Sequence, residues 1–149
     1  MKTKKLTLLS LLTAIALTIF MVEAQIPALV PIPGIKLGLA NVVTLVALYR
    51  LKGRYAFAIV IPRCILGAMF GGGITGLLFS LTGGLLALVT MLLSRKVKLF
   101  SVYGVSVLGA AAHNIGQIFV AMFLMNSVYV AGYLPYLLGV SVFTGMATG

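Results

Sequence analysis

Long apolar stretches alternate with short basic clusters along this chain. The clusters lie at residues 2–5, 50–54 and 95–98, and they hold nine of the eleven lysines and arginines. Lys and Arg accumulate in short cytoplasmic loops of membrane proteins. Because each interval between clusters holds two apolar stretches, the chain is predicted to cross the membrane outwards and back each time. The pattern therefore predicts an even number of crossings and a cytoplasmic N-terminus.

We expect an all-α integral membrane protein, a single transmembrane domain over residues 1–149 built as a bundle of about six helices. The expected spans are residues 6–25, 37–49, 55–70, 74–93, 99–124 and 134–149. A spanning helix needs about 20 apolar residues, so the second span is short and is expected to begin within the preceding loop or to sit in a protein-lined hollow. The sixth span lacks a basic flank, so the chain is expected to be truncated or unusually short there.

The segment between the first two spans is rich in helix-breaking residues. Residues 26–36 (IPALVPIPGIK) contain three prolines and a glycine, which a continuous helix does not tolerate. This segment is predicted to be an outer loop, with a re-entrant loop as the alternative.

Composition supports a multi-pass protein of the plasma membrane. The chain is 62% hydrophobic and 8% charged, whereas soluble domains carry about 25% charged residues. Its net charge of +10 is expected to face anionic lipid headgroups of the inner leaflet rather than nucleic acid. A cleavable signal peptide is the alternative for the N-terminus, but the apolar run at residues 6–22 is long for one. Glu23 would also lie within the candidate cleavage site, so we expect a retained first helix.

Few polar side chains interrupt the apolar stretches, and such side chains are functional candidates because hydrocarbon disfavours them. The candidates for substrate binding are Glu23, Lys36, Asn41, Arg63, His113, Asn114 and Gln117. On a helix, residues three and four apart share a face, so the last three are expected on one side of the fifth span. The set is predicted to converge in the outer half of the bundle, as a pocket that opens outwards.

Structural alternatives exist for several of these residues. His113 and Gln117 could hydrogen-bond neighbouring helices, as polar residues in membrane bundles commonly do. Glu23 could pair with Lys36 at the interface, and it is also the single acidic residue available to Arg63.

The sequence offers little for catalysis. It contains no aspartate, one glutamate and one cysteine, Cys64, so it cannot supply a carboxylate pair, an intramolecular disulfide or a Cys/His metal site. It also lacks a phosphate-binding loop ending in Lys-Ser/Thr. We therefore expect no enzyme activity, no metal and no cofactor.

Small residues spaced four apart favour close helix packing. They recur as Gly67-x-x-x-Gly71, Gly72-x-x-x-Gly76, Ala112-x-x-x-Gly116 and Gly145-x-x-x-Gly149. We expect these pairs to pack within the bundle. Ala14 and Thr18, which have the same spacing on the first span, are candidates for a partner interface.

Three stretches together resemble one family. They are PGIKLGLAN at residues 33–41 with the following VVTLVALY, Arg63 with the glycines after it, and AHNIGQ at residues 112–117. The chain is similar to the Gx transporter family, often labelled heptaprenyl diphosphate synthase component I. That family resembles the substrate-binding S components of energy-coupling-factor (ECF) vitamin transporters.

The resemblance implies a six-helix subunit that captures a small vitamin or cofactor precursor from outside the cell. Such a subunit works with a transmembrane T component and two cytoplasmic ATPases, and it often docks through an alanine pair on its first helix. Here Thr18 replaces the second alanine, and the sixth span is shorter than the family's pattern.

Two other functions remain as alternatives. One is a non-catalytic membrane accessory subunit of heptaprenyl diphosphate or quinone biosynthesis. Prenyltransferases hold diphosphate through Mg²⁺ on aspartate-rich motifs, since hard cations need several oxygen ligands, and this chain cannot build such a site. A stand-alone ion-coupled transporter is third, because one acidic residue offers little for coupling.

Overall fold

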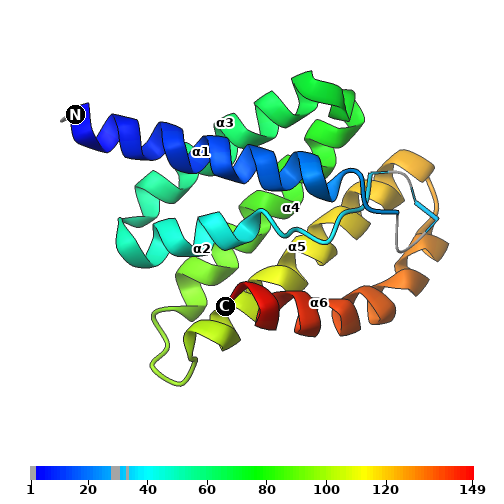
Figure 1. The fold of residues 1–149 in the computed structure, drawn as a ribbon. Helices are drawn as coiled ribbons and strands as arrows, with labels where there is room; N and C mark the ends of the chain where they lie inside the picture. Colours follow the sequence, from blue (N-terminus) through cyan, green and yellow to red (C-terminus); the bar gives the residue numbers. More distant parts are fainter. Residues whose placement is uncertain (1–2, 28–30, 33) are drawn as a thin grey trace.

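The computed structural model describes residues 3–27, 31–32 and 34–149, and this part of the chain is all-helical (Figure 1). The α-helices are α1 (Thr3–Glu23), α2 (Asn41–Arg50), α3 (Gly53–Gly67), α4 (Gly73–Ser94), α5 (Val102–Met125) and α6 (Leu134–Thr148). A π-helical turn, η1 (Ala68–Gly72), joins α3 to α4, and a 3-10 helix, η2 (Val128–Tyr133), precedes α6. The expected all-α class is thus confirmed for the described residues.

Within the described part of the chain, four segments are long and apolar enough to cross a membrane: residues 3–23, 53–94, 102–125 and 128–148. The second segment is two helices, because the chain reverses at η1, where Phe70 and Gly71 leave the helical conformation and Gly71 has a φ of 135°. Helix α2 has 10 residues and is too short to span a bilayer alone. The number of six crossings therefore stays a prediction.

Several predicted boundaries differ from the observed ones. The first helix ends at Glu23 rather than residue 25, α2 begins at Asn41 rather than residue 37, and α3 ends at Gly67 rather than residue 70. The fifth helix begins at Val102 instead of residue 99, because the hydroxyl of Ser101 accepts the backbone N–H of Gly104 and caps the helix. Apolar composition alone does not mark such caps.

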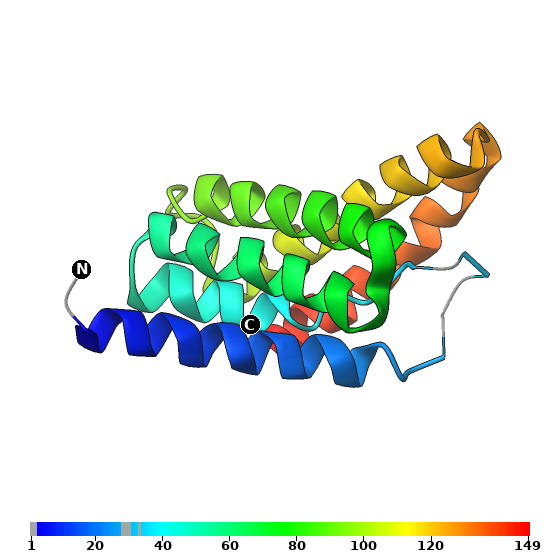
Figure 2. The ribbon, with the colours of Figure 1, turned by 90° about the horizontal axis from the view of Figure 1, so that it is seen from above.

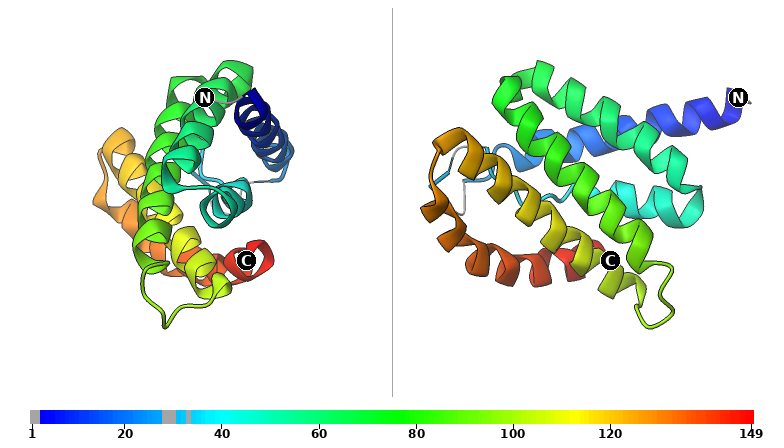
Figure 3. Two further views of the ribbon diagram at one scale, coloured as in Figure 1. Left: turned by 90° about the vertical axis from the view of Figure 1, so that its left-hand side faces the viewer. Right: turned by 180° about the vertical axis from the view of Figure 1, so that it is seen from behind.

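The helices form two groups that share α4 (Figure 2). In one group α1 packs on α3 and α3 on α4; in the other α5 packs between α4 and α6. Helix α2 contacts α1, α3, α4 and α5, and it lies between α1 and α6 in the views of Figures 1 and 3.

Glycines allow the closest helix contacts in the second group. A Cβ at Gly116 of α5 would lie 3.0 Å from Cα of Gly83 on α4. Gly145 of α6 packs directly against the backbone of Val107 on α5. By contrast, a Cβ at Gly71 or Gly76 would meet nothing within 4 Å, so the expectation of packing within the bundle is wrong for those two glycines.

The described part of the loop between α1 and α2 packs into the bundle. Ile32 and Ile35 are buried in a cluster with Phe79 of α4, Ile118 of α5 and Leu137 of α6. Because the loop fills space between the helices, it positions its polar backbone beside their side chains.

Candidate functional site

Polar side chains from separate elements meet at one small void inside the bundle. It is lined by Glu23, Lys36, Arg63, Ser80, His113 and Gln117, together with the Phe20 ring. Its volume of about 10 Å³ approaches the room that one water molecule requires. We call this void and its polar lining the polar chamber.

Glu23, at the end of α1, holds the loop in the chamber. Its carboxylate accepts the backbone N–H of Gly38 through one oxygen, at 2.6 Å, and that of Leu39 through the other, at 3.0 Å. On the other side, Gln117 Oε1 of α5 accepts the N–H of Lys36 at 3.3 Å. Non-helical backbone at membrane depth needs such internal partners, and here side chains of two helices provide them.

The same carboxylate lies at the start of α2. Ala40 precedes α2 and provides no side-chain cap. The negative charge of Glu23, bound to the amides just before the helix, complements the positive end of the helix dipole. Glu23 therefore stabilises the loop and the beginning of α2 together.

Arg63, on α3, is 2% exposed and has few partners in the described part of the chain. Its Nε lacks a hydrogen-bond partner among these residues, and its Nη2 makes a long contact of 3.7 Å with the sulfur of Cys64. Both oxygens of Glu23 are already bound to the loop. The chamber thus contains a buried guanidinium whose hydrogen-bonding capacity is largely unused.

His113, on α5, is 3% exposed and fits between two glycines. A Cβ at Gly38 would lie 2.6 Å from its Cδ2, and a Cβ at Gly83 would lie 2.7 Å from its Nδ1. Within residues 3–27, 31–32 and 34–149, neither ring nitrogen has a hydrogen-bond partner. The ring is therefore fixed by packing, with Nδ1 beside Gly83 of α4.

Lys36 extends its ammonium over the Phe20 ring, with Nζ 3.3 Å from the ring centroid, in a cation–π contact. Burial lowers the pKa of Lys36, the Glu23 carboxylate opposes this shift, and the Arg63 charge adds to it. An anionic partner for this ammonium would therefore be favourable.

A larger cleft adjoins the chamber between the end of α1, the loop, α5 and α6. Its volume is about 250 Å³. Glu23 and Lys36 line both spaces, while apolar side chains such as Ile26, Ile35 and Leu137 line the cleft alone. We call this space the outer cleft.

The two remaining candidates, Asn114 and Asn41, do not line the polar chamber. Asn114 lines the outer cleft, and its Nδ2 donates to the Leu137 carbonyl at 3.0 Å and to Ser141 Oγ at 2.8 Å. Asn114 thus faces α6, while its neighbours His113 and Gln117 line the chamber. Asn41 lines a separate hollow with Ser106, and its amide atoms have no partner in the described ranges.

Comparison with known families gives this site a context. The profile of a family described as heptaprenyl diphosphate synthase component I matches residues 12–149. The chain belongs to this heptaprenyl diphosphate synthase component I family. Neither a curated protein nor a solved structure matches it.

The family is named for one component of a synthase that has several. As a component I protein with four long apolar segments among its described residues, the chain is a membrane-associated subunit, and the family description implies partner proteins. Among its described residues, no three His, Cys, Asp or Glu side chains lie close enough together to hold a metal ion.

The component I chain also contains site residues that the sequence reasoning missed. Ser80, 6% exposed on α4, lines the chamber, and its polarity within an apolar span was a usable signal. Ser141 on α6 binds Asn114 and carried the same signal. No sequence signal pointed to Phe20, because aromatic residues are common in apolar stretches.

The candidate partner surface of the component I chain lies on the outer side of α1. Ala14 and Thr18 are both exposed, and the Thr18 hydroxyl donates to the Ala14 carbonyl at 3.0 Å. That bond satisfies the Thr18 hydroxyl within α1, so the hydroxyl needs no polar partner on another protein.

Proposed function

We propose that this component I protein is the substrate-binding S component of an ECF-type, ATP-driven importer for a small vitamin or cofactor precursor. The observation that carries the proposal is the gathering of Glu23, Lys36, Arg63, His113 and Gln117 around one void beside the outer cleft. Ionisable residues inside a membrane bundle are expensive and usually functional. A protein that served only as an anchor would need Glu23 and Gln117 to hold the loop, but it would have no need of the buried Arg63.

The orientation predicted from the basic clusters suits uptake. With the N-terminus in the cytoplasm, the end of α1, the loop and the outer cleft face the exterior. Asn114 and Asn41 belong to the proposed substrate-binding set, Asn114 in the outer cleft and Asn41 in the hollow beyond Gly38.

The driving force would come from a transmembrane T component and two cytoplasmic ATPases, since this chain has no nucleotide-binding motif. The exposed Ala14 and Thr18 are the proposed contact with these partners. Small residues permit close helix approach, which suits a docking surface on α1.

A second candidate is a non-catalytic accessory subunit of heptaprenyl diphosphate or quinone biosynthesis. The family description favours it. In that case the polar chamber would serve only to hold the loop, and the partner would be a soluble prenyl synthase.

Purification of the tagged chain from its own membranes in mild detergent tests the two candidates. Recovery of a T component with paired ATPases supports the importer, and recovery of a soluble prenyl synthase without them overturns it in favour of the accessory subunit.

A substitution on α1 tests the proposed contact. Ala14→Leu adds bulk to a close helix contact, so we expect pull-down of the partners to fall while the chain keeps its thermal unfolding midpoint. Ala147→Leu, an equal substitution at an exposed position of α6, is the control. Equal recovery of partners by the two variants would exclude this surface.

A further inference from the structure

The charges around the polar chamber do not balance. Arg63 and Lys36 contribute positive groups and Glu23 contributes the negative one. The carboxylate of Glu23 is bound to the N–H groups of Gly38 and Leu39. Among the described residues, the chamber therefore has one positive charge in excess.

The hydrogen bonds of the chamber are also incomplete. Arg63 Nε and His113 Nε2 have no partner in the described part of the chain. Buried polar groups are nearly always hydrogen-bonded, and a buried charge without a counter-charge is strongly unfavourable. One water molecule could satisfy a hydrogen bond here, but it could not neutralise the charge.

We infer that the polar chamber receives the single anionic group of a small ligand, a carboxylate or a phosphate. This inference rests on the proposed substrate-binding function. Guanidinium groups bind both anions through paired, charge-assisted hydrogen bonds. The body of the ligand lies in the outer cleft, which shares Glu23 and Lys36 with the chamber as lining residues.

The present size of the chamber adds a conformational requirement. A carboxylate is larger than one water molecule, so binding has to move part of the lining outwards. Lys36 is suited to this movement, because its ammonium is held by the Phe20 ring and the residue lines both chamber and cleft. When the ligand binds, the Lys36 ammonium leaves the Phe20 ring and contacts the anionic group.

A direct test uses His113, the single histidine of the chain, as a reporter. The full chain with ¹⁵N-labelled histidine is placed in lipid nanodiscs, and the imidazole signals are followed by NMR. The probes are hexanoate, hexyl phosphate, hexanamide and hexylammonium, which share a six-carbon chain and differ in charge. We expect saturable shifts with hexanoate or hexyl phosphate and no saturation with the other two.

Arg63→Gln should weaken the binding of the anionic probe at least about tenfold, with Arg54→Gln, an exposed position on the same helix, as the matched control. The comparison between hexanoate and hexyl phosphate identifies which anion the chamber accepts. The comparison with hexanamide needs only the unmodified chain, so the test holds even if Arg63→Gln fails to fold.

Results that contradict the anionic-ligand inference can be distinguished from results that contradict the importer proposal. If hexanamide or hexylammonium binds as tightly as the anionic probes, the inference of an anionic ligand is overturned. The proposal of a substrate-binding subunit is not affected by that result. If no probe perturbs His113 saturably, the anionic site is overturned, whereas the importer itself is decided by the copurified partners. Unchanged anion binding in a folded Arg63→Gln protein also overturns the inference.

Discussion

Glu23 and Arg63 are both buried and ionisable, yet their surroundings differ. The Glu23 carboxylate is engaged by two backbone amides, whereas Arg63 Nε has no partner in the described residues. Structural residues in membranes are expected to be satisfied within the protein. The contrast shows that Glu23 anchors the loop, and it supports the proposed role of Arg63 in ligand recognition.

Glu23→Gln should destabilise the protein. The variant loses the charge and one of two acceptors for the loop amides, and hydrogen bonds to charged groups contribute about 1.5–3 kcal/mol each. Thermal unfolding in detergent should show the loss, and hydrogen exchange at Gly38 and Leu39 should accelerate. Gln25→Ala, at an exposed neighbouring position, is the control. Unchanged exchange at both amides would contradict the anchoring role.

Arg63→Met should have the opposite effect on the unfolding midpoint of the ligand-free protein. Replacing buried charges by apolar side chains of similar volume is often neutral or stabilising by about 1–4 kcal/mol. We expect a midpoint equal to or above that of the unmodified chain. A clear decrease would mean that the guanidinium has a structural partner, and would count against its role in recognition.

At the scale of elements, the closeness of α4 and α5 sets the position of the chamber. Gly83 and Gly116 let the two backbones approach, and Gly83 also leaves room for the His113 ring. The contact therefore packs two helices and orients a site residue at once.

Gly116→Ala should push α4 and α5 apart, because the new Cβ would lie 3.0 Å from Cα of Gly83 and 3.1 Å from the Thr82 carbonyl oxygen. Backbone cannot yield as a flexible side chain does, so we expect a loss of about 1–3 kcal/mol in stability. Gly76→Ala, where a Cβ would meet nothing within 4 Å, should be neutral or stabilising. Equal unfolding midpoints for the two variants would refute the close contact.

How far the sequence predicted the site depended on the kind of interaction. Charged and amide residues inside apolar spans stand out, so the grouping of Arg63, His113 and Gln117 was foreseeable. The partners of Glu23 were not, because they are backbone amides in a loop and carry no residue signature. Asn41 was grouped with the other candidates only by its expected depth in the membrane. Depth does not determine the direction in which a side chain points from a short helix.

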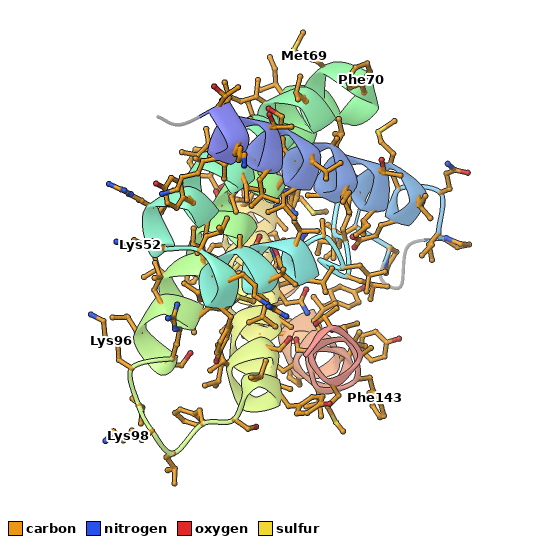
Figure 4. All side chains as sticks on the ribbon, turned by 60° about the vertical axis from the view of Figure 1, so that its left-hand side comes forward. Lys52, Met69, Phe70, Lys96, Lys98 and Phe143 are labelled. Carbon is orange, nitrogen blue, oxygen red and sulfur yellow. The ribbon has the colours of Figure 1, made fainter. Side chains whose placement is uncertain are left out.

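At the scale of the whole molecule, the charges define two ends. Lys52, Lys96 and Lys98 point outwards on one side of the bundle, whereas Met69 and Phe70 lie at the turn on the far end of α3 (Figure 4). Near the basic end, Arg95 Nη1 donates to the Leu48 carbonyl and its guanidinium stacks on Tyr49. These contacts join α4 to α2 where lipid headgroups are expected.

The orientation can be measured with single cysteines in a Cys64→Ala background. Cysteine at Lys98 should react with a membrane-impermeant maleimide only after the cells are permeabilised, because basic loops stay in the cytoplasm. Cysteine at Tyr129, which is 94% exposed in η2, should react in intact cells. Labelling of the Lys98 position in intact cells would invert the topology and place the outer cleft in the cytoplasm.

The short length of α2 affects how far a solute would have to travel through the protein. Ten residues extend for about 15 Å, roughly half the thickness of the hydrocarbon layer. The described residues directly before α2, 34–40, are not helical. In the proposed importer, a solute that reached the polar chamber from outside would therefore meet α2 along only part of its path, and the part beyond the chamber would have to open towards the cytoplasm.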